Sequence, residues 1–355
     1  MARSEPSSAT TPSQRIPADS HAAGTGAAHC PPLGVLLVNL GTPEAPTASA
    51  LRTYLRQFLS DRRVIELPRL LWWPILYGVI LNTRPRQSAE KYARIWSPEG
   101  SPLAVNTAAQ SEKLARALNK IRPCFQVDWA MRYGTPSIAA RLAGLQNNGC
   151  QRIVVIPLYP QYSASTTAST MDDIGHYLQR SRHQPQLRII HSFYRDSGYI
   201  AALARQVRRH WRRHGRGKKL LMSFHGMPQS AIDQGDPYHE QCLVTAAALA
   251  HQLQLAPDEW QATFQSRFGR AHWLQPYTQP TLEALAAAGV DEVDILCPGF
   301  PSDCLETLEE IGMECRDAFL QAGGRHYHYI PCLNADPCWV IALRNLVLRE
   351  TQGWL

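Results

Sequence analysis

Apolar runs and amphipathic segments alternate along most of the chain. Runs rich in aliphatic residues predict strands at 34–40, 127–133, 153–158, 187–191, 219–223, 262–265 and 293–297. Apolar positions at helical spacing predict helices at 108–120, 138–146, 171–181, 199–214, 238–253, 281–288, 306–322 and 339–350. Strands that alternate with helices are typical of parallel sheets. The pattern therefore predicts an α/β fold of two Rossmann-like lobes, each a parallel sheet flanked by helices.

The two sets of elements meet near residues 165–185. This predicts a first lobe at 32–175 and a second lobe at 176–335, followed by a C-terminal helix at 336–355. Of the first thirty residues, 20 are Ala, Gly, Pro, Ser or Thr. Because they contain no continuous apolar core, we expect a disordered extension at 1–31 rather than a signal peptide. A transit peptide is the alternative, since this extension is poor in acids and contains Arg3 and Arg15.

The net charge of +7 is unevenly distributed. Residues 205–219 contain eight Arg and Lys residues and no acid. Such a stretch could suit nucleic acid, but no nucleic-acid-binding motif accompanies it, so we expect no nucleic-acid partner. We favour a solvated helix face that can also contact anionic lipid.

The nine cysteines are scattered, odd in number and without a Cys-x-x-Cys pair. This spacing excludes a secreted disulfide framework and a zinc ribbon. We expect reduced thiols in a cytoplasmic protein.

Residues 64–81 are rich in Leu, Ile, Trp and Tyr. A membrane-spanning helix needs about 20 predominantly apolar residues, and Glu66, Pro68, Arg69 and Pro74 interrupt this one. The segment is therefore either a buried helix or an exposed apolar lip, with Trp72, Trp73, Leu76 and Tyr77 near a membrane surface.

A histidine follows one of the predicted buried strands. The apolar run at 220–224 leads to His225, and Gly226 and Pro228 then end the strand. Open α/β sheets bind their ligands at the carboxyl ends of strands, and histidine can gain or lose a proton near neutral pH. An isolated histidine would be interpreted as a loop residue, but a second polar cluster follows.

That second cluster comes after the predicted strand at 293–297. Pro298 and Gly299 end the strand, and Ser302 or Asp303 can cap a helix with Glu306 at the capping-box position. Glu306, Glu310 and Glu314 are spaced four apart and would share one helical face. They form either a solvated acidic face or a row of carboxylates that guides a divalent cation or protons. The order of strand, turn, cap and carboxylates favours the second interpretation.

The chain contains the motifs Ser-Phe-His-Gly-Met-Pro at 223–228, Gln-Gly-Asp-Pro-Tyr at 234–238 and Pro-Gly-Phe-x-x-Asp-Cys-Leu-Glu-Thr-Leu-Glu-Glu at 298–310, and further distinctive stretches at 36–43, 131–134, 157–163 and 264–269. Together these motifs resemble the ferrochelatase family. They follow the family's order from about residue 33 to about residue 348. The resemblance implies the two-lobed chelatase fold, with the C-terminal helix packed on the first lobe. It also implies insertion of ferrous iron into a porphyrin at the end of haem synthesis.

The resemblance assigns the catalytic roles. It implies that His225 either accepts a pyrrole proton or binds the incoming iron, and both roles stay open. Glu306 would face His225 across the pocket as a second catalytic residue and metal ligand. Asp303 and Glu310 would lie behind it as a relay for protons or metal.

The resemblance also implies a porphyrin slot. The residues expected to line it are Arg84, Arg132, Tyr133, Tyr159, Ser163 and Trp273. Without the resemblance, we would interpret Tyr159 and Trp273 as ordinary core residues and Arg132 as part of a buried salt bridge. Cys304 stands where the animal enzymes have histidine, and we interpret it as a small apolar residue rather than a thiolate ligand.

No permanently bound cofactor is expected, because Fe²⁺ is a substrate. Members with a [2Fe–2S] cluster have a Cys after the Pro-Gln-Tyr-Ser run and a Cys-rich tail. Here Ala164 follows Ser163 and the chain ends at Leu355 without such a tail. We therefore expect no iron–sulfur cluster, although Cys150, Cys332 and Cys338 are candidate ligands.

The resemblance thus implies a ferrochelatase that converts protoporphyrin IX and Fe²⁺ into protohaem and two protons. The alternatives are a coproporphyrin ferrochelatase, an anaerobic cobalt chelatase and a non-catalytic tetrapyrrole carrier. A carrier would not need Glu306 opposite the histidine. We expect a monomer or weak dimer in the cytoplasm, with transient contact of residues 64–81 at the inner membrane surface.

Overall fold

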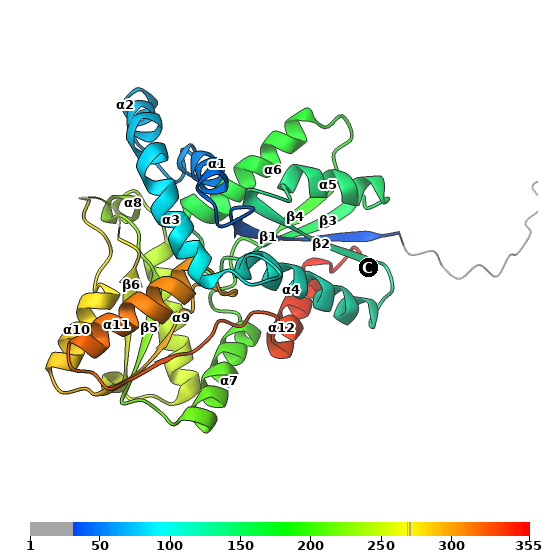
Figure 1. Cartoon of the computed structure of the whole chain (residues 1–355). Helices are drawn as coiled ribbons and strands as arrows, with labels where there is room; N and C mark the ends of the chain where they lie inside the picture. The colour runs from blue at the N-terminus through cyan, green and yellow to red at the C-terminus, as the bar shows by residue number, and fades with distance from the viewer. Residues whose placement is uncertain (1–30, 268, 270) are drawn as a thin grey trace, which may run out of the picture. The chain divides into compact units, whose positions relative to one another are not determined.

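Two four-stranded sheets form the framework of the computed structural model, which describes residues 31–267, 269 and 271–355. The first sheet has the order β2-β1-β3-β4 and the second the order β6-β5-β7-β8 (Figure 1). All the strand pairs are parallel. The strands are β1 (Leu33–Gly41), β2 (Phe125–Tyr133), β3 (Arg152–Pro157), β4 (Gln186–Ile189), β5 (Lys219–His225), β6 (Trp260–Gln265), β7 (Glu292–Leu296) and β8 (His326–Tyr329). The predicted α/β fold with two parallel sheets is confirmed.

The two sheets have the same topology. In each, the first strand in sequence lies in the interior, the second pairs on one side of it and the third on the other. The chain therefore changes direction across the sheet at the carboxyl ends of β1 and β5. Open α/β sheets bind ligands at such switch points.

Helices cover the sheets, and most of those predicted are present. The α-helices are α1 (Ala48–Leu59), α2 (Arg69–Ile75), α3 (Leu81–Ile95), α4 (Pro102–Asn119), α5 (Ile138–Asn147), α6 (Ser169–Arg180), α7 (Ser197–His214), α8 (Gln229–Asp233), α9 (Tyr238–Leu253), α10 (Thr278–Ala287), α11 (Arg316–Gln321) and α12 (Pro337–Glu350). In the described part of the chain, the π-helical segments are η1 (Leu76–Ile80), η2 (Ala164–Ala168) and η4 (Glu306–Cys315), and η3 (Pro257–Glu259) is a 3₁₀ turn.

The hydrophobic core explains why the interior strands were predictable. Residues 33–38 of β1 are almost completely buried. On one face of the first sheet, Leu36 and Val38 pack with Ile153 and Val155. Parallel strands covered on both faces need continuous apolar runs, which are easily seen in a sequence.

Three features differ from the sequence predictions. The helix expected at 306–322 is π-helical as far as Cys315 and becomes α11 only at Arg316. Strand β8 was not predicted, because its His-Tyr-His-Tyr sequence has no apolar run and lies at a sheet edge. Strand β4 pairs with β3, so the first sheet continues past residue 175, where the first lobe was expected to end.

The segment at 64–81 is buried on one side and exposed on the other. Trp72 and Leu76 are buried, and the Trp72 indole donates to the Leu59 carbonyl oxygen at 2.7 Å. These two residues therefore do not belong to an exposed lip. Leu67 is exposed before α2, and the exposed apolar side chains of α2 and η1, called the apolar lip below, are Leu70, Leu71, Trp73, Ile75, Tyr77 and Val79. Within the described ranges, no helix has the length and apolar character that crossing a membrane requires.

Helix α12 packs against α4 and α7 (Figure 1). The fully buried Trp339 ring lies 5.3 Å from the Tyr199 ring and 5.5 Å from the Phe193 ring, measured between centroids. Beyond the helix, Arg152 of β3 donates to the Trp354 carbonyl oxygen at 3.0 Å. The end of the chain is thus attached to the first sheet.

We predict that Trp339→Ala lowers the free energy of unfolding by about 3–5 kcal/mol, because it leaves a cavity beside the rings of Tyr199 and Phe193. Chemical denaturation followed by circular dichroism would measure this. The matched control is Ile341→Ala on the same helix, where the side chain is 46% exposed, with an expected change within about 0.5 kcal/mol. Equal effects of the two substitutions would contradict the packing role of Trp339.

Candidate active site

His225 is the last residue of β5 and is half-buried. Its Nδ1 lies 2.7 Å from the Gly226 carbonyl oxygen. A carbonyl oxygen can only accept, so Nδ1 holds the hydrogen and the neutral ring has its lone pair on Nε2. The Tyr238 hydroxyl donates to the His225 carbonyl oxygen at 3.0 Å. The imidazole is therefore held with Nε2 available to accept a proton or bind a metal.

Gly226 permits a close approach between β5 and β6. Its N–H donates to the Gln265 carbonyl oxygen at 2.7 Å, and a Cβ at this position would lie 2.5 Å from the same oxygen. That Cβ would also lie 3.2 Å from the Trp273 ring. A larger residue would push the end of β5 away, so glycine is required beside His225.

Glu310 of η4 is fixed by residues at the end of β6. The Ser266 N–H donates to Oε1 at 2.7 Å, while the Ser266 hydroxyl and the Gln265 amide donate to Oε2 at 2.5 and 3.3 Å. Burial raises the pKa of Glu310, although the Ser266 hydrogen bonds and the charge of His225 oppose this effect. The negative charge of Glu306 adds to the increase. Glu310 therefore interacts electrostatically with both His225 and Glu306.

Glu306 begins η4 and is half-buried. Its carbonyl oxygen accepts from the Gln265 side-chain amide at 2.8 Å. Tyr54 of α1 and Tyr92 of α3 are buried nearby. The pKa of each tyrosine is raised, mainly by burial, and the charge of Glu306 contributes to both shifts. Glu306 thus lies where the second sheet meets helices that follow β1.

The predicted row of Glu306, Glu310 and Glu314 is not formed. Glu306 and Glu310 belong to the group around His225, but the Glu314 carboxylate binds Lys91 of α3 at 2.6 Å. The sequence prediction assumed α-helical spacing, whereas η4 is π-helical. The expected capping box does not form, because η4 has no side-chain cap hydrogen bond at its start. The Ser302 hydroxyl instead accepts from the Gln110 amide at 2.7 Å.

Asp303 is buried and accepts four hydrogen bonds. The donors are the Tyr329 hydroxyl at 2.5 Å, the Thr307 hydroxyl at 3.1 Å, the Cys332 N–H at 3.3 Å and the Asn334 amide at 2.6 Å. These contacts are those of a residue that fixes the start of η4 against the loop after β8. Its role in a proton or metal relay stays a prediction.

A second polar group lies at the carboxyl end of β2. Asp61 accepts from Arg132 at 2.7 Å, from the Tyr133 hydroxyl at 2.7 Å and from the Ser169 hydroxyl at 2.6 Å. Burial opposes ionisation of Asp61, but these bonds, an Arg63 N–H and the charge of Arg132 hold its pKa below the usual range. The Arg132 guanidinium also lies over the Tyr133 ring, 4.6 Å from its centroid.

The other predicted porphyrin residues come from four separate segments. Tyr159 follows β3 and lies near Arg132, whose charge partly offsets the increase in the tyrosine pKa caused by burial. The buried Ser163 hydroxyl donates to Asp236 at 3.2 Å. Trp273 pairs through its backbone with Pro228, and its indole N–H has no hydrogen-bond partner among the described residues. Arg84 is exposed on α3.

Sequence reasoning missed residues that fix this site. Gln265, Ser266 and Asp61 hold the predicted residues in place, and Tyr54 and Tyr92 lie near enough to Glu306 for its charge to raise their pKa values. A signal existed for Gln265, which is polar and ends the predicted strand at 262–265, and for Ser266, which directly follows it. The tyrosines and Asp61 have no comparable signal, because they approach only through the packing of α1 and α3.

Cys304 behaves as an apolar residue. It is buried with Leu103 and Met131, and burial, followed by the charge of Glu306, raises the pKa of its thiol. A neutral thiol is a poor metal ligand. Across the described part of the chain, no three His, Cys, Asp or Glu side chains already form a metal-binding group.

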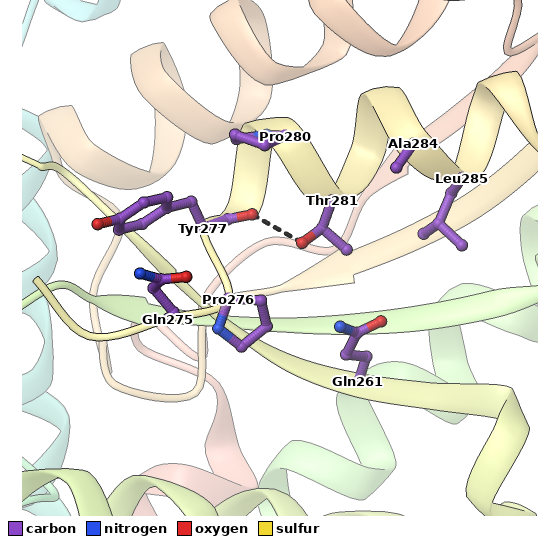
Figure 2. Close-up of a pocket in the computed structure, with 8 residues that line it drawn as sticks. All are labelled: Gln261, Gln275, Pro276, Tyr277, Pro280, Thr281, Ala284 and Leu285. Atoms are coloured by element: carbon purple, nitrogen blue, oxygen red, sulfur yellow. Dashed lines mark hydrogen bonds between the residues drawn. The ribbon is translucent and has the colours of Figure 1, made fainter.

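A shallow depression of about 450 Å³ lies elsewhere, between β6 and α10. Figure 2 shows its lining, with Tyr277 and Gln275 at one end and Leu285 at the other. None of the predicted catalytic or porphyrin residues lines this depression. It is therefore separate from the group around His225.

Known proteins are similar to this chain over most of its length. The Ferrochelatase family model matches residues 32–351. The ferrochelatase of Azoarcus sp. strain BH72 is 61% identical over 91% of this chain and 88% of its own, and that of Aromatoleum aromaticum is 58% identical over the same shares. The solved structure of SirB from Bacillus subtilis with Fe³⁺ covers 90% of this chain and 95% of its own at 14% identity and a TM-score of 0.51, which supports the fold alone. From these matches, the chain belongs to the ferrochelatase family.

Proposed function

We propose that this chain inserts Fe²⁺ into protoporphyrin IX, giving protohaem and two protons. The observation that most supports the proposal is that Gln265, the sheet partner of His225, donates to both the Glu306 carbonyl oxygen and the Glu310 carboxylate. Membership of the ferrochelatase family agrees with this chemistry.

Metallation requires removal of two weakly acidic pyrrole protons and transfer of the metal from water to the ring. The hydrogen bond at His225 Nδ1 leaves Nε2 to accept a proton or to bind Fe²⁺ transiently. The raised pKa of Glu310 brings this carboxyl nearer to the operating pH, which suits proton transfer. Glu306 can pass protons or metal between His225 and Glu310.

The porphyrin would be held by the residues at the ends of β2 and β3. Arg132 and Tyr133 are fixed by Asp61, so they offer a rigid surface. A rigid wall can turn ring-binding energy into distortion of the macrocycle, which exposes the nitrogen lone pairs. The exposed Arg84 is suited to a propionate.

No resident cofactor belongs to this proposal, since iron enters as substrate. Cys150 lies in the core of the first sheet and Cys332 in that of the second. Thiols in separate cores cannot ligate one cluster, which supports the expectation that no [2Fe–2S] centre is present. Coproporphyrin is the alternative substrate, cobalt insertion the alternative reaction, and the carboxylates beside His225 argue against a carrier.

We also propose transient contact with a membrane surface through the apolar lip. Leu70 is 92% exposed, Leu71 64% and Val79 56%, which is unusual for neighbouring large apolar side chains. Insertion of such side chains contributes about 25 cal/mol per Å² of buried apolar surface. A monomer or weak dimer in the cytoplasm, bound peripherally at the inner membrane, fits this surface.

We predict that His225→Ala abolishes iron insertion while porphyrin still binds, because the imidazole acts on the pyrrole protons or the metal and not on the ring faces. Anaerobic assays following loss of the free-base spectrum would measure turnover, and fluorescence quenching would measure binding. The control is His239→Ala, which removes another histidine of the same lobe. Turnover near that of the wild type in His225→Ala would contradict the assignment.

For the carboxylates, we expect Glu306→Gln and Glu310→Gln each to lower kcat by roughly 100-fold, since an amide cannot transfer protons. In the wild type, kcat should rise as pH passes upward through the raised pKa of Glu310, because only the carboxylate accepts a proton. Glu310→Gln should flatten this limb of the pH profile. The exposed Glu112→Gln serves as control, and an unchanged profile in Glu310→Gln would exclude the role.

The apolar lip is tested by vesicle co-sedimentation. We expect Leu70→Ser/Trp73→Ser/Val79→Ser to lose binding to vesicles, because these side chains are exposed and would enter the bilayer surface. The matched control is Ile121→Ser/Leu243→Ser/Ile341→Ser, three exposed apolar residues outside the lip. If the lip variant and the wild type partition equally, the membrane proposal is wrong.

A further inference from the structure

Lys91 of α3 binds two carboxylates of η4. Its Nζ lies 3.1 Å from Glu309 Oε2 and 2.6 Å from Glu314 Oε1. Arg94, one helical turn further along α3, adds a contact of 3.3 Å to Glu309 Oε1. The Glu309 side chain is only 1% exposed, whereas that of Glu314 is 43% exposed. A buried carboxylate of the second half is thus neutralised by cations from a helix of the first.

The buried member of this group depends on Lys91. Burial raises the pKa of Glu309, and the Lys91 ammonium acts in the opposite direction. A buried charge that loses its partner is strongly unfavourable. Without Lys91, the Glu309 carboxylate would have to bind a proton or turn towards water.

The spacing of the two carboxylates matches the π-helix. Glu309 and Glu314 are five residues apart, and a π-helix has hydrogen bonds between residues five apart, which places them on one side. In an α-helix, residues five apart point about 140° away from each other. One ammonium therefore reaches both carboxylates when this stretch is π-helical.

The same register sets the catalytic carboxylates. Glu309 directly precedes Glu310 and follows Glu306 by three residues. If one turn of η4 changed from π-helical to α-helical geometry, the Glu310 side chain would rotate relative to that of Glu306. This rotation would break the hydrogen bonds between Glu310 and Ser266. We propose that Lys91 is a positioning residue, which holds η4 in π-helical register through Glu309 and Glu314 and so keeps Glu306 and Glu310 beside His225. The role assigned to these carboxylates rests on the proposed function.

This contact also joins the site to the apolar lip. Helix α2, η1 and α3 follow one another without a break from Arg69 to Ile95 (Figure 1). Lys91 is therefore part of the helical run that includes the lip, and displacement of that run would reach η4 through Lys91.

The test uses the full chain with Lys91→Met, Lys91→Arg and the control Lys218→Met. Lys218 forms a more exposed bridge with Asp291, at 2.7 Å, and neither residue belongs to η4. We expect Lys91→Met to lower kcat for iron insertion by roughly 10- to 100-fold, as small misplacements of catalytic groups do, with little change in KM for porphyrin. Lys91→Arg should restore kcat to within about threefold, because a guanidinium can also bridge two carboxylates. Lys218→Met should match the wild type.

A second measurement separates positioning from stability. The double variant Lys91→Met/Glu309→Gln removes the unpaired charge, so its melting temperature should return towards that of the wild type while kcat stays low. Hydrogen–deuterium exchange over 306–315 should be faster in Lys91→Met and unchanged in Lys218→Met. If kcat recovers together with the melting temperature, or if Lys91→Met has normal kcat and exchange, the proposal is overturned. If the wild type inserts no iron, the proposed function fails, and the exchange data still test the register.

Discussion

The Gln265 side chain is the junction on which the candidate active site depends. It ends β6 opposite His225 in the sheet register, and its oxygen accepts from the Ser223 hydroxyl at 2.8 Å. Its amide donates to the Glu306 carbonyl oxygen at 2.8 Å and to the Glu310 carboxylate at 3.3 Å. Leaving the oxygen or the NH₂ group of a buried amide without a hydrogen bond lowers the stability of the folded state. Satisfying both sides fixes the start of η4 against the end of β5 and β6, and so brings the carboxylates to the histidine.

The hydrophobic pattern was sufficient for the sheets but not for every element. Buried strands such as β1 and β3 need continuous apolar runs, so their positions could be predicted to within two residues. The edge strand β8 has neighbours on one side only and tolerates His326 and His328. The repeated topology of the two sheets could not be predicted either, because equal strand order does not require similar residues.

For the site, sequence reasoning located the residues better than their arrangement. His225 was predictable because a polar residue ended an apolar strand at a sheet edge that binds ligands. The sequence could not show which glutamates lie near His225 and which bind Lys91. A sequence pattern is interpreted with α-helical spacing by default, and the π-helix at η4 places Glu314 with Glu309 and Lys91 instead. Contacts between residues far apart in the sequence, such as Asp61 with Arg132 and Tyr133, follow from tertiary packing and have no local signal.

The most direct test asks whether the wild-type chain catalyses many rounds of iron insertion. Under strict exclusion of oxygen, substoichiometric protein is mixed with protoporphyrin IX and excess Fe²⁺, and absorption spectra are recorded against a protein-free control. A catalyst at the His225 group should convert many equivalents of free-base porphyrin into haem per protein molecule. Binding of about one porphyrin equivalent, with no metallation beyond the protein-free rate, would identify a carrier and contradict the account.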